Sequence, residues 1–587
     1  MQLQAPAAGP IPGFDAIAME VFANRLLSIT ESMAINMMRS SFSAQIKERR
    51  DFSVGLFDGE GRLVAQGTHI PVHLGSLMGI VEGLLARYPR AQIRPGDAFI
   101  SNDPYAAGGT HLPDIAIATP VFQDGELIAF AVNIGHHSDV GGSAPGSTSP
   151  TARSIFEEGL RLPVMRVCQE GRINEDILDL VALNSRLPEE RRLDLRVQIA
   201  TNERGIAAVL ELVSRIGVDG FKARIRDLLD YTRRRLDLRI AGLTEGATGS
   251  FTAWLDDDGL PDGEMVPLCA AVSVEAGKLV IDFTGSGPEA RGAINIAHNA
   301  LRATVYYCVK AILDPELMAN SGMIDSIVLR APAGTIVNPR PPAPVGSRTI
   351  ACQRLAGAIF GAFQPLIGRD ARQASGYDVL PAVGLSGYHP DSGTYWMCGE
   401  TVGGGGGARC DGDGMDGIHV HVTNSLNFPS EAIENEAPVR VEEYALVQNS
   451  GGCGRWRGGM GIARTLRALH DKTIFNARSD RHKAGAPGEY GGKAGGKGRL
   501  LRNPGTEREQ VLPSKVALLA LNAGETVRIE TPGGGGFGDP AERPVKMVAQ
   551  DLRDELITEE FARAGYGDAL VDSALELLRG GRRESAG

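Results

Sequence analysis

The stretch SNDPYAAGGTHLPDIAIATPVFQDGELIAFAVNIGHHSDVGG, residues 101–142, predicts a long β-hairpin with a polar open end. Two apolar runs, at 115–122 and 127–135, are typical of strands, because each is short and bounded by polar and turn-forming residues. Between them, Asp124 and Gly125 form a dipeptide that strongly favours a two-residue hairpin turn. The polar residues outside the two runs must therefore meet at the open end of this hairpin.

The two-residue turn fixes the predicted register, in which Asp114 faces Gly135, one position from His136. His111 precedes Asp114 on a loop that Pro113 keeps non-helical. Two imidazoles and one carboxylate are a common ligand set for Zn²⁺, Mn²⁺ or Fe²⁺ with open coordination positions. We therefore predict a divalent metal site formed by His111, Asp114 and His136. A hydrogen-bonded polar loop cluster is the alternative.

Further polar residues near the hairpin are candidates for chemistry. His137 and Asp139 follow the second strand, where they could orient a metal-bound imidazole or contact the substrate, and we assign them to proton transfer. We assign Asp103, His69 and His73 to substrate binding. In GTHIPVHLGS the two histidines have the spacing of one helix face, but the proline between them indicates a turn. A loop packed against the site is the alternative for this pair.

Two other features carry weaker signals. His419 and His421, in IHVHVTNSLNFPSE, would share one face of a strand, and they could bind a ligand or pack in a core or interface. Their role stays open. The run GGKAGGKG at 491–498 imitates a phosphate-binding loop, but it lacks the Ser or Thr that holds Mg²⁺, so we predict no nucleotide or other cofactor site there. The clusters at 403–407 and 533–536 are expected to be turns where backbones meet.

The composition describes a large globular protein. The chain has 587 residues, of which 43% are hydrophobic, so several domains are expected and disorder of the bulk is excluded. The formal net charge of −11 argues against nucleic-acid binding, which favours a basic face. Seven scattered cysteines without a CxxC pair indicate neither a disulfide framework nor a structural zinc site. Without a signal-peptide pattern or an apolar run of membrane-spanning length, we expect no membrane association and a cytoplasmic location.

The mixture of helical and strand patterns predicts an α+β, multi-domain fold rather than alternating βαβ units. We divide the chain into an N-terminal metal-binding catalytic region (14–243), a middle α+β region (244–378), a glycine-rich β region (379–544) and a helical C-terminal tail (545–587). Expected helices lie at 14–42, 75–87, 299–313 and 352–364, and through most of 172–242. Expected strands outside the first hairpin lie at 97–101, 250–255, 265–273 and 278–284, with a second hairpin over 52–66.

Five stretches of the chain resemble the hydantoinase B/oxoprolinase family, and the resemblance extends over residues 15–570. The stretches are SFSAQIKERRDFSVGLFDGEGRLVAQGTHIPVHLGSL (41–77), SNDPYAAGGTHLPDIAIATPVF (101–122), HHSDVGGSAPGS (136–147), HVHVTNSLNFPSEAIE (419–434) and TPGGGGFGDP (531–540). Stretches of this length and order make the resemblance specific for the family, although not for one substrate.

The resemblance implies a B-type subunit that works with an obligate partner, a hydantoinase A-type ATPase subunit with an actin-like fold, in a hetero-oligomer such as α2β2. The partner is expected to use ATP to phosphorylate the amide or carbonyl oxygen of a small-molecule substrate. The B-type subunit then binds a divalent metal ion, Zn or Mn, and completes the reaction. The family's HxxD motif and the histidine after the next strand match His111, Asp114 and His136.

From this resemblance we predict a subunit of an ATP-dependent cyclic-amide hydrolase that opens a hydantoin, 5-oxoproline or another lactam ring. The carboxylase members, which include the acetone carboxylase alpha subunit, are longer as a group, so the length of this chain fits the hydrolase branch better. One alternative is a subunit of an ATP-dependent ketone carboxylase. The other is a non-catalytic scaffold for the ATPase subunit.

Overall fold

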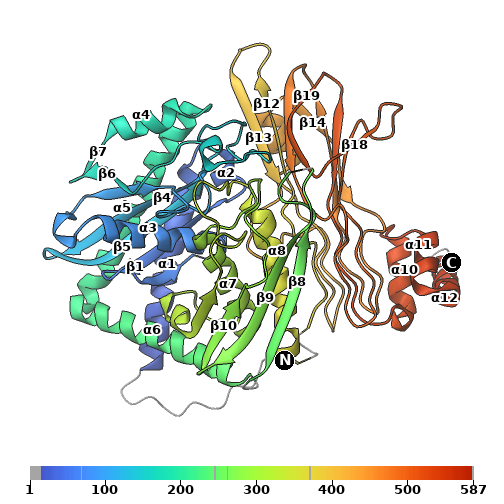
Figure 1. Cartoon of the computed structure of the whole chain (residues 1–587), viewed down its shortest axis with the longest axis horizontal. Helices are drawn as coiled ribbons and strands as arrows, with labels where there is room; N and C mark the ends of the chain where they lie inside the picture. The colour runs from blue at the N-terminus through green and yellow to red at the C-terminus, as the bar shows by residue number, and fades with distance from the viewer. Residues whose placement is uncertain (1–14, 68, 244–245, 261, 369–371, 585–587) are drawn as a thin grey trace.

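The computed structural model describes residues 15–67, 69–243, 246–260, 262–368 and 372–584. Helices and strands are mixed along the chain, which confirms the predicted α+β class. In Figure 1 the N-terminal half forms a layered body, the glycine-rich half lies beside it, and short helices end the chain. Within the described ranges, no helix combines the length and the apolar character of a transmembrane span.

A seven-stranded sheet carries the predicted hairpin at its centre. Its strands are β1 (Phe52–Asp58), β2 (Leu63–Gln66), β3 (Ala98–Ser101), β4 (Asp114–Gln123), β5 (Glu126–His136), β6 (Met165–Gln169) and β7 (Arg172–Ile173). They follow the order β2-β1-β5-β4-β3-β6-β7, and β1 with β2 confirms the predicted hairpin over 52–66. The sheet therefore joins two hairpins that are separated in the sequence.

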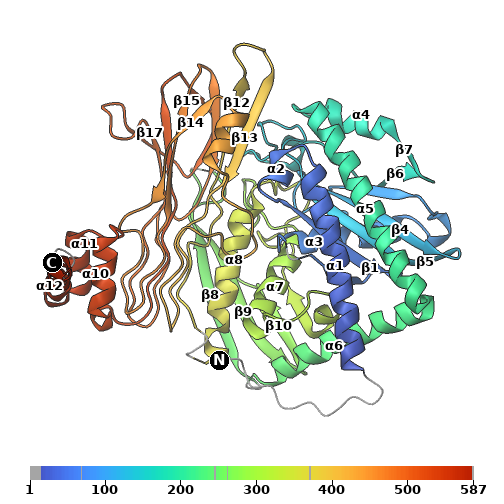
Figure 2. The ribbon, with the colours of Figure 1, turned by 180° about the vertical axis from the view of Figure 1, so that it is seen from behind.

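Helices cover both faces of this sheet. The helices of the region are α1 (Ala16–Ser40), α2 (Ala44–Lys47), α3 (His73–Arg87), α4 (Glu175–Leu183), α5 (Pro188–Ile216) and α6 (Val218–Ala241). Figure 2 shows α1 and α5 lying across one face of the strands, and α3 packs against the other face. Because both faces are covered, β4 and β5 are buried along most of their length and show no alternation of apolar and polar residues.

The β4–β5 hairpin confirms the predicted strands but corrects their register. Near the turn the pairing follows the prediction. Farther along, a β-bulge adds Ile128 to β5 and shifts the register by one position. Asp114 therefore faces His136 directly, instead of Gly135. The bulge brings the predicted carboxylate and imidazole opposite each other.

A smaller sheet and two long helices extend the core of the first sheet. The strands are β8 (Thr248–Leu255), β9 (Val266–Glu275), β10 (Lys278–Asp282) and β11 (Ile327–Arg330), and the helices are α7 (His298–Leu313) and α8 (Arg348–Phe363). Helix α8 packs on β8 and β9, and α7 lies between α8 and α3, so one hydrophobic cluster runs through all of them. This packing carries the first residue of α8, Arg348, to the open end of the β4–β5 hairpin.

Two antiparallel sheets enclose a further core in the C-terminal half. Their strands are β12 (Ala382–Tyr388), β13 (Tyr395–Thr401), β14 (Val439–Leu446), β15 (Ile462–Ala468), β16 (Thr473–Arg478), β17 (Arg499–Arg502), β18 (Gln510–Leu512), β19 (Lys515–Leu521) and β20 (Thr526–Glu530). The orders are β13-β12-β16-β19 and β14-β15-β20-β17-β18, and α9 (Ser430–Glu436) packs into the same core. The chain ends with α10 (Val545–Arg553), α11 (Glu559–Tyr566) and α12 (Asp568–Glu584).

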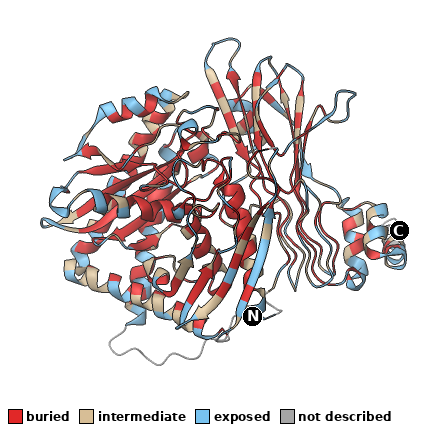
Figure 3. Cartoon of the chain, in the orientation of Figure 1, coloured by how far each residue is buried: buried red, intermediate tan, exposed pale blue. Residues whose placement is uncertain are grey.

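The glycine clusters at 403–407 and 533–536 are extended segments and not turns, but backbones do meet there as expected. They run side by side between β8 and the helices α10–α12 in Figure 1, and Figure 3 shows that they are largely buried. Gly459 and Gly534 come from different segments, and the Gly534 N–H donates to the Gly459 carbonyl at 2.9 Å. A Cβ on Gly534 would lie 1.9 Å from the carbonyl oxygen of Gly406. Glycine is needed here because only a residue without a side chain lets buried backbones approach this closely.

Candidate metal centre

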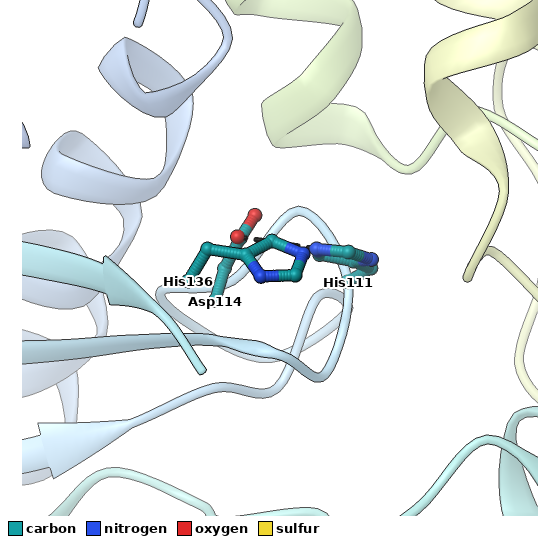
Figure 4. A group of neighbouring side chains, drawn as sticks. All are labelled: His111, Asp114 and His136. Carbon is teal, nitrogen blue, oxygen red and sulfur yellow. Dashed lines mark hydrogen bonds and ion pairs between the residues drawn. The ribbon is translucent and has the colours of Figure 1, made fainter. Parts of the chain in front are cut away.

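The three side chains predicted as metal ligands converge at the open end of the β4–β5 hairpin. Asp114 begins β4 and His136 ends β5, so their pairing sets them opposite each other, while His111 reaches in from the loop before β4. One ligand atom from each side chain lies within 4.8 Å of the others (Figure 4). His111 and Asp114 are fully buried, so the protein, rather than solvent, sets their environment.

The protonation states of the three side chains suit a divalent cation. Burial lowers the pKa of His111 to about 4 and the pKa of His136 to about 3, so both imidazoles are neutral at neutral pH. Burial alone would raise the pKa of Asp114, but the charge of Arg348 and the hydrogen bonds to the carboxylate outweigh burial and hold this pKa well below its usual value. The cluster therefore presents two neutral imidazoles and one carboxylate.

The hydrogen bonds of the two histidines leave a place for a cation. Nδ1 of His111 lies 3.1 Å from the carbonyl oxygen of Gly346, which can only accept, so Nδ1 carries the proton. Nε2 then has a lone pair 3.1 Å from Oδ1 of Asp114, and two acceptors at this distance repel each other unless a cation lies near both. Nδ1 of His136 is buried without a hydrogen-bond partner in the described part of the chain. Both observations fit a bound metal ion.

Asp51 and His73 extend the polar cluster, and only His73 is predicted from the sequence. Nε2 of His73 lies 3.6 Å from a carboxylate oxygen of Asp51 and 3.6 Å from Oδ1 of Asp114. His73 is the first residue of α3, so Pro71 precedes the helix and the expected turn is present. The N–H of His136 donates to the Asp51 carbonyl at 3.0 Å. The sequence does not predict that Asp51 lies here, because the pairing of β1 with β5 that positions it joins segments distant in the sequence.

Thr110 and Arg348 hold the Asp114 carboxylate in position. Both donate to Oδ2, Thr110 from its hydroxyl at 2.7 Å and Arg348 from its guanidinium at 2.8 Å. The other oxygen, Oδ1, is left facing His111 and His73. Partners of this kind orient a metal ligand and raise the affinity of the site. No local sequence signal marks Arg348, because packing of α8 alone carries it to the hairpin.

The structure does not bring His137 or Asp139 into the cluster. Nε2 of His137 lies 2.9 Å from Oε1 of Gln198 on α5, and the imidazole is buried there. The Asp139 carboxylate accepts hydrogen bonds from backbone N–H groups of its own loop and from the guanidinium of Arg186 at 2.8 Å. A carboxylate so fully hydrogen-bonded is poorly placed to carry a proton. The geometry therefore favours structural roles for both residues over the expected proton transfer.

Asp139→Asn is expected to destabilise the protein while leaving its metal content unchanged. The amide cannot accept every hydrogen bond that the carboxylate accepts, and losing a buried bond to a charged group costs about 1–3 kcal/mol. Thermal unfolding should therefore give a lower Tm, and elemental analysis should give the wild-type metal content per chain. An unchanged Tm together with a loss of turnover would instead assign Asp139 to the chemistry.

Asp103 and His69 also lie apart from the cluster. The Asp103 carboxylate caps its own loop and pairs with Arg161 at 2.8 Å. His69 packs against Phe52, with ring centroids 5.0 Å apart, and lines a different cavity. Of the three residues predicted to bind substrate, the structure therefore places only His73 beside His111, Asp114 and His136. These three side chains are called the metal cluster below.

His419 and His421 do not share a strand face, so the prediction of a strand is wrong here. His421 has a positive φ of 55°, which turns the chain and sends the two side chains to different partners. Nε2 of His419 lies 3.1 Å from Oδ1 of Asn427, and Nε2 of His421 lies 2.7 Å from Oδ1 of Asp378. The two imidazoles are separate hydrogen-bonding groups.

A cavity of about 100 Å³ opens beside the metal cluster. This volume has room for several water molecules, and hence for a small polar ligand. His73, His136 and Asp51 line one side, and residues of β12, β13 and β16 line the other. The N-terminal sheet and the glycine-rich half therefore both form its wall.

The fold and the cluster define a multi-domain α+β protein with a candidate metal centre of two histidines and one aspartate. The chain belongs to the Hydantoinase B/oxoprolinase family, whose sequence profile matches residues 15–540. It is 34% identical to an uncharacterized protein of Methanocaldococcus jannaschii, with 94% of this chain and 96% of that protein aligned. It is 30% identical to the putative D-/L-hydantoinase B subunit of Pseudomonas sp., with 95% and 96% aligned.

A longer relative shows a partial match. The 5-oxoprolinase PfmaA of Pestalotiopsis fici is 33% identical over 89% of this chain, but the chain spans only 41% of that protein's length. Among solved structures, the ATP-dependent caprolactamase of Pseudomonas jessenii superposes with a TM-score of 0.87 and 27% identity, over 94% of this chain and 96% of that one. Acetone carboxylase superposes with a TM-score of 0.84 over 97% of this chain and 84% of that one, and its 19% identity shows a shared fold alone.

Proposed function

We propose that this chain is the metal-dependent subunit of an ATP-dependent cyclic-amide hydrolase. It would open a hydantoin, 5-oxoproline or other lactam ring after a partner subunit has phosphorylated the substrate. The observation that carries this proposal is the buried cluster of His111, Asp114 and His136 beside a cavity. Membership of the family and the similarity to a caprolactamase and to a hydantoinase B subunit support it.

The residues of this chain would have different roles at the proposed metal centre. His111, Asp114 and His136 would hold a divalent ion, and the donor set suits Zn or Mn. When bound, such an ion would supply Lewis acidity that favours attack of water on the ring carbon bearing the phosphorylated oxygen. Thr110 and Arg348 fix the Asp114 carboxylate. His73 lines the cavity and is the imidazole placed to exchange a proton there.

ATP would be used by a partner subunit of the A type. The glycine-rich run at 491–498 supports this division of labour, because most of its N–H groups already donate to backbone carbonyls. These donors are Gly492, Lys493, Gly495, Gly496 and Gly498. The chain covers 96% of a hydantoinase B subunit but 41% of a 5-oxoprolinase, whose additional length could supply the second activity. We further propose a cytoplasmic hetero-oligomer, such as an α2β2 assembly.

The test combines this chain with an A-type ATPase subunit and a panel of hydantoins, 5-oxoproline and lactams. We expect ADP and a ring-opened amino acid to appear together, and no ATP hydrolysis by this chain alone. ATP turnover that requires bicarbonate would favour the ketone carboxylase alternative. Acetone carboxylase has the same fold, so this alternative is included in the test. A metal-free chain whose cluster tolerates alanine would favour the scaffold alternative.

A further inference from the structure

Three arginine side chains line the cavity beside the metal cluster. Arg49 follows α2, Arg348 begins α8 and Arg478 ends β16, and their exposed fractions are 4%, 2% and 8%. Arg348 pairs with Asp114 at 2.8 Å. Neither Arg49 nor Arg478 forms an ion pair with a carboxylate among the residues that the structure describes. Neither buried guanidinium therefore has a directly paired carboxylate, although Glu158 and Asp51 lie close enough to favour the charged form of Arg478.

The hydrogen bonds of these two arginines go to neutral groups. Nη2 of Arg49 donates to the Thr401 hydroxyl at 2.7 Å, and Nη1 donates to the Gln45 side-chain oxygen and to the Gly399 carbonyl. Nη1 of Arg478 donates to the Gly346 carbonyl at 3.2 Å and lies 3.4 Å from the Ser347 hydroxyl. Nε of each arginine is buried without a hydrogen-bond partner in the described ranges. Each guanidinium therefore keeps an N–H group that no described residue accepts.

Two carboxylates also line the cavity, and each interacts with Arg49 at longer range but has a nearer partner. Asp51 lies beside His73, 3.6 Å away, at the metal cluster. Glu400 pairs with Arg464 at 3.1 Å. Burial raises the pKa of Glu400 to about 7, so its negative charge is only partial at neutral pH. The wall therefore carries an excess of positive charge, and a divalent ion at the cluster would increase it.

This excess charge favours an anionic ligand. Burying a guanidinium without a counter-charge is unfavourable. Burial and the neighbouring Arg348 and Arg49 lower the pKa of Arg478 to about 9, so the three cations lie close enough to repel one another. The planar guanidinium matches phosphate oxygens in pairs, which makes arginine a preferred phosphate ligand.

The position of Arg478 connects such an anion to the metal cluster. The carbonyl oxygen of Gly346 accepts from Nη1 of Arg478 and also from Nδ1 of His111. One peptide group therefore separates the arginine from a predicted metal ligand. A ligand that contacts Arg478 can reach the cluster with its next few atoms.

We propose that Arg49 and Arg478 bind a phosphoryl group, the one carried by the phosphorylated substrate, and so hold the carbon that bears it against the metal cluster. The identity of the ligand as substrate rests on the proposed function, whereas the anion site rests on the arginines themselves. Arg348 is committed to Asp114 and adds positive charge behind the carboxylate.

Inorganic phosphate is the probe for this site, titrated by calorimetry into the purified full-length chain at low ionic strength. We expect saturable binding by the wild type and an affinity lower by about tenfold or more in Arg478→Gln and in Arg49→Gln, because each loses charge-assisted hydrogen bonds. Arg478→Lys should keep part of the affinity. Arg302→Gln is the matched control, since Arg302 pairs with Glu82 away from the cavity, and its phosphate affinity should equal that of the wild type.

Phosphate also binds divalent ions, so the titration is repeated on His136→Ala. Binding that persists there, and is lost when Arg478→Gln is added, assigns the phosphate to the arginines. Binding lost in His136→Ala alone assigns it to a metal and overturns the proposal. Absence of saturable binding, or wild-type affinity in a folded arginine variant, also overturns it. If phosphate binds as expected but the two-subunit assay opens no cyclic amide, the anion site stands and the proposed function fails.

Discussion

His136→Ala is expected to empty the metal centre and to stop substrate turnover. His136 is the proposed ligand from β5, and without it His111 and Asp114 supply only two of the three proposed donors. Substitution of residues that merely orient metal ligands already costs about 10–100-fold in affinity or activity, so loss of a ligand should cost at least about 100-fold in both. Elemental analysis of the purified variant and ring opening with the partner subunit measure the two effects.

His69→Ala is the matched control for this experiment. His69 is also a partly buried histidine, but it packs against Phe52 outside the cluster, so its variant should keep the wild-type metal content and turnover. Thermal unfolding of both variants separates loss of metal from loss of fold. Wild-type metal content and turnover in His136→Ala would exclude the cluster as the reactive centre and favour the scaffold alternative.

The position of the candidate metal site could be predicted because two of its residues belong to one hairpin and the third to the loop directly before it. An Asp-Gly turn between two apolar runs determines which residues meet at the open end, and this information is local. The register could not be predicted to the residue. Ile128, the extra residue of the bulge, is as apolar as its neighbours, and an extra residue within a buried strand leaves no mark in the pattern.

The rest of the site depends on contacts between distant segments. Pairing of β1 with β5 places Asp51, packing of α8 on α7 places Arg348, and the C-terminal sheet places Arg478. A single sequence shows local periodicity but not which sheet edge meets which helix. For the same reason the sequence predicts functional roles for Asp103 and Asp139, because both are close to the proposed ligands in sequence. In the structure their carboxylates stabilise their own loops.

Helices and glycine clusters differ in how well the sequence predicts them. The helices expected at 299–313 and 352–364 are confirmed as α7 and α8; apolar residues recur at helical spacing in α7, whereas α8 is buried on nearly every side. Glycine content carries no such period. Glycine content alone does not show whether a turn or a close backbone contact requires a residue without a side chain. The segments 403–407 and 533–536 contact residues that are distant from them in the sequence.

Gly534→Ala is expected to prevent normal folding of the glycine-rich layer. The added Cβ would lie 1.9 Å from the carbonyl oxygen of Gly406. The backbone cannot easily withdraw, because the Gly534 N–H donates to Gly459 and its carbonyl accepts from Gly452, both at 2.9 Å. Overpacking a dense interior typically costs about 1–3 kcal/mol, and the cost is higher where backbone rather than a flexible side chain is in the way. Thermal unfolding should show a markedly lower Tm, or expression should yield no folded protein.

Gly368→Ala is the control, because Gly368 is exposed and a Cβ there meets no atom within 4 Å, so its Tm should stay close to that of the wild type. The damage in Gly534→Ala should also reach the cavity, since β13 supplies part of the cavity wall and continues directly into the glycine segment at 403–407. A folded fraction of this variant should therefore bind phosphate more weakly than the wild type, although Gly534 is remote from the metal cluster in sequence. Wild-type stability would mean that the layer can separate enough to admit a methyl group, and close backbone contact would then not explain why glycine occupies these positions.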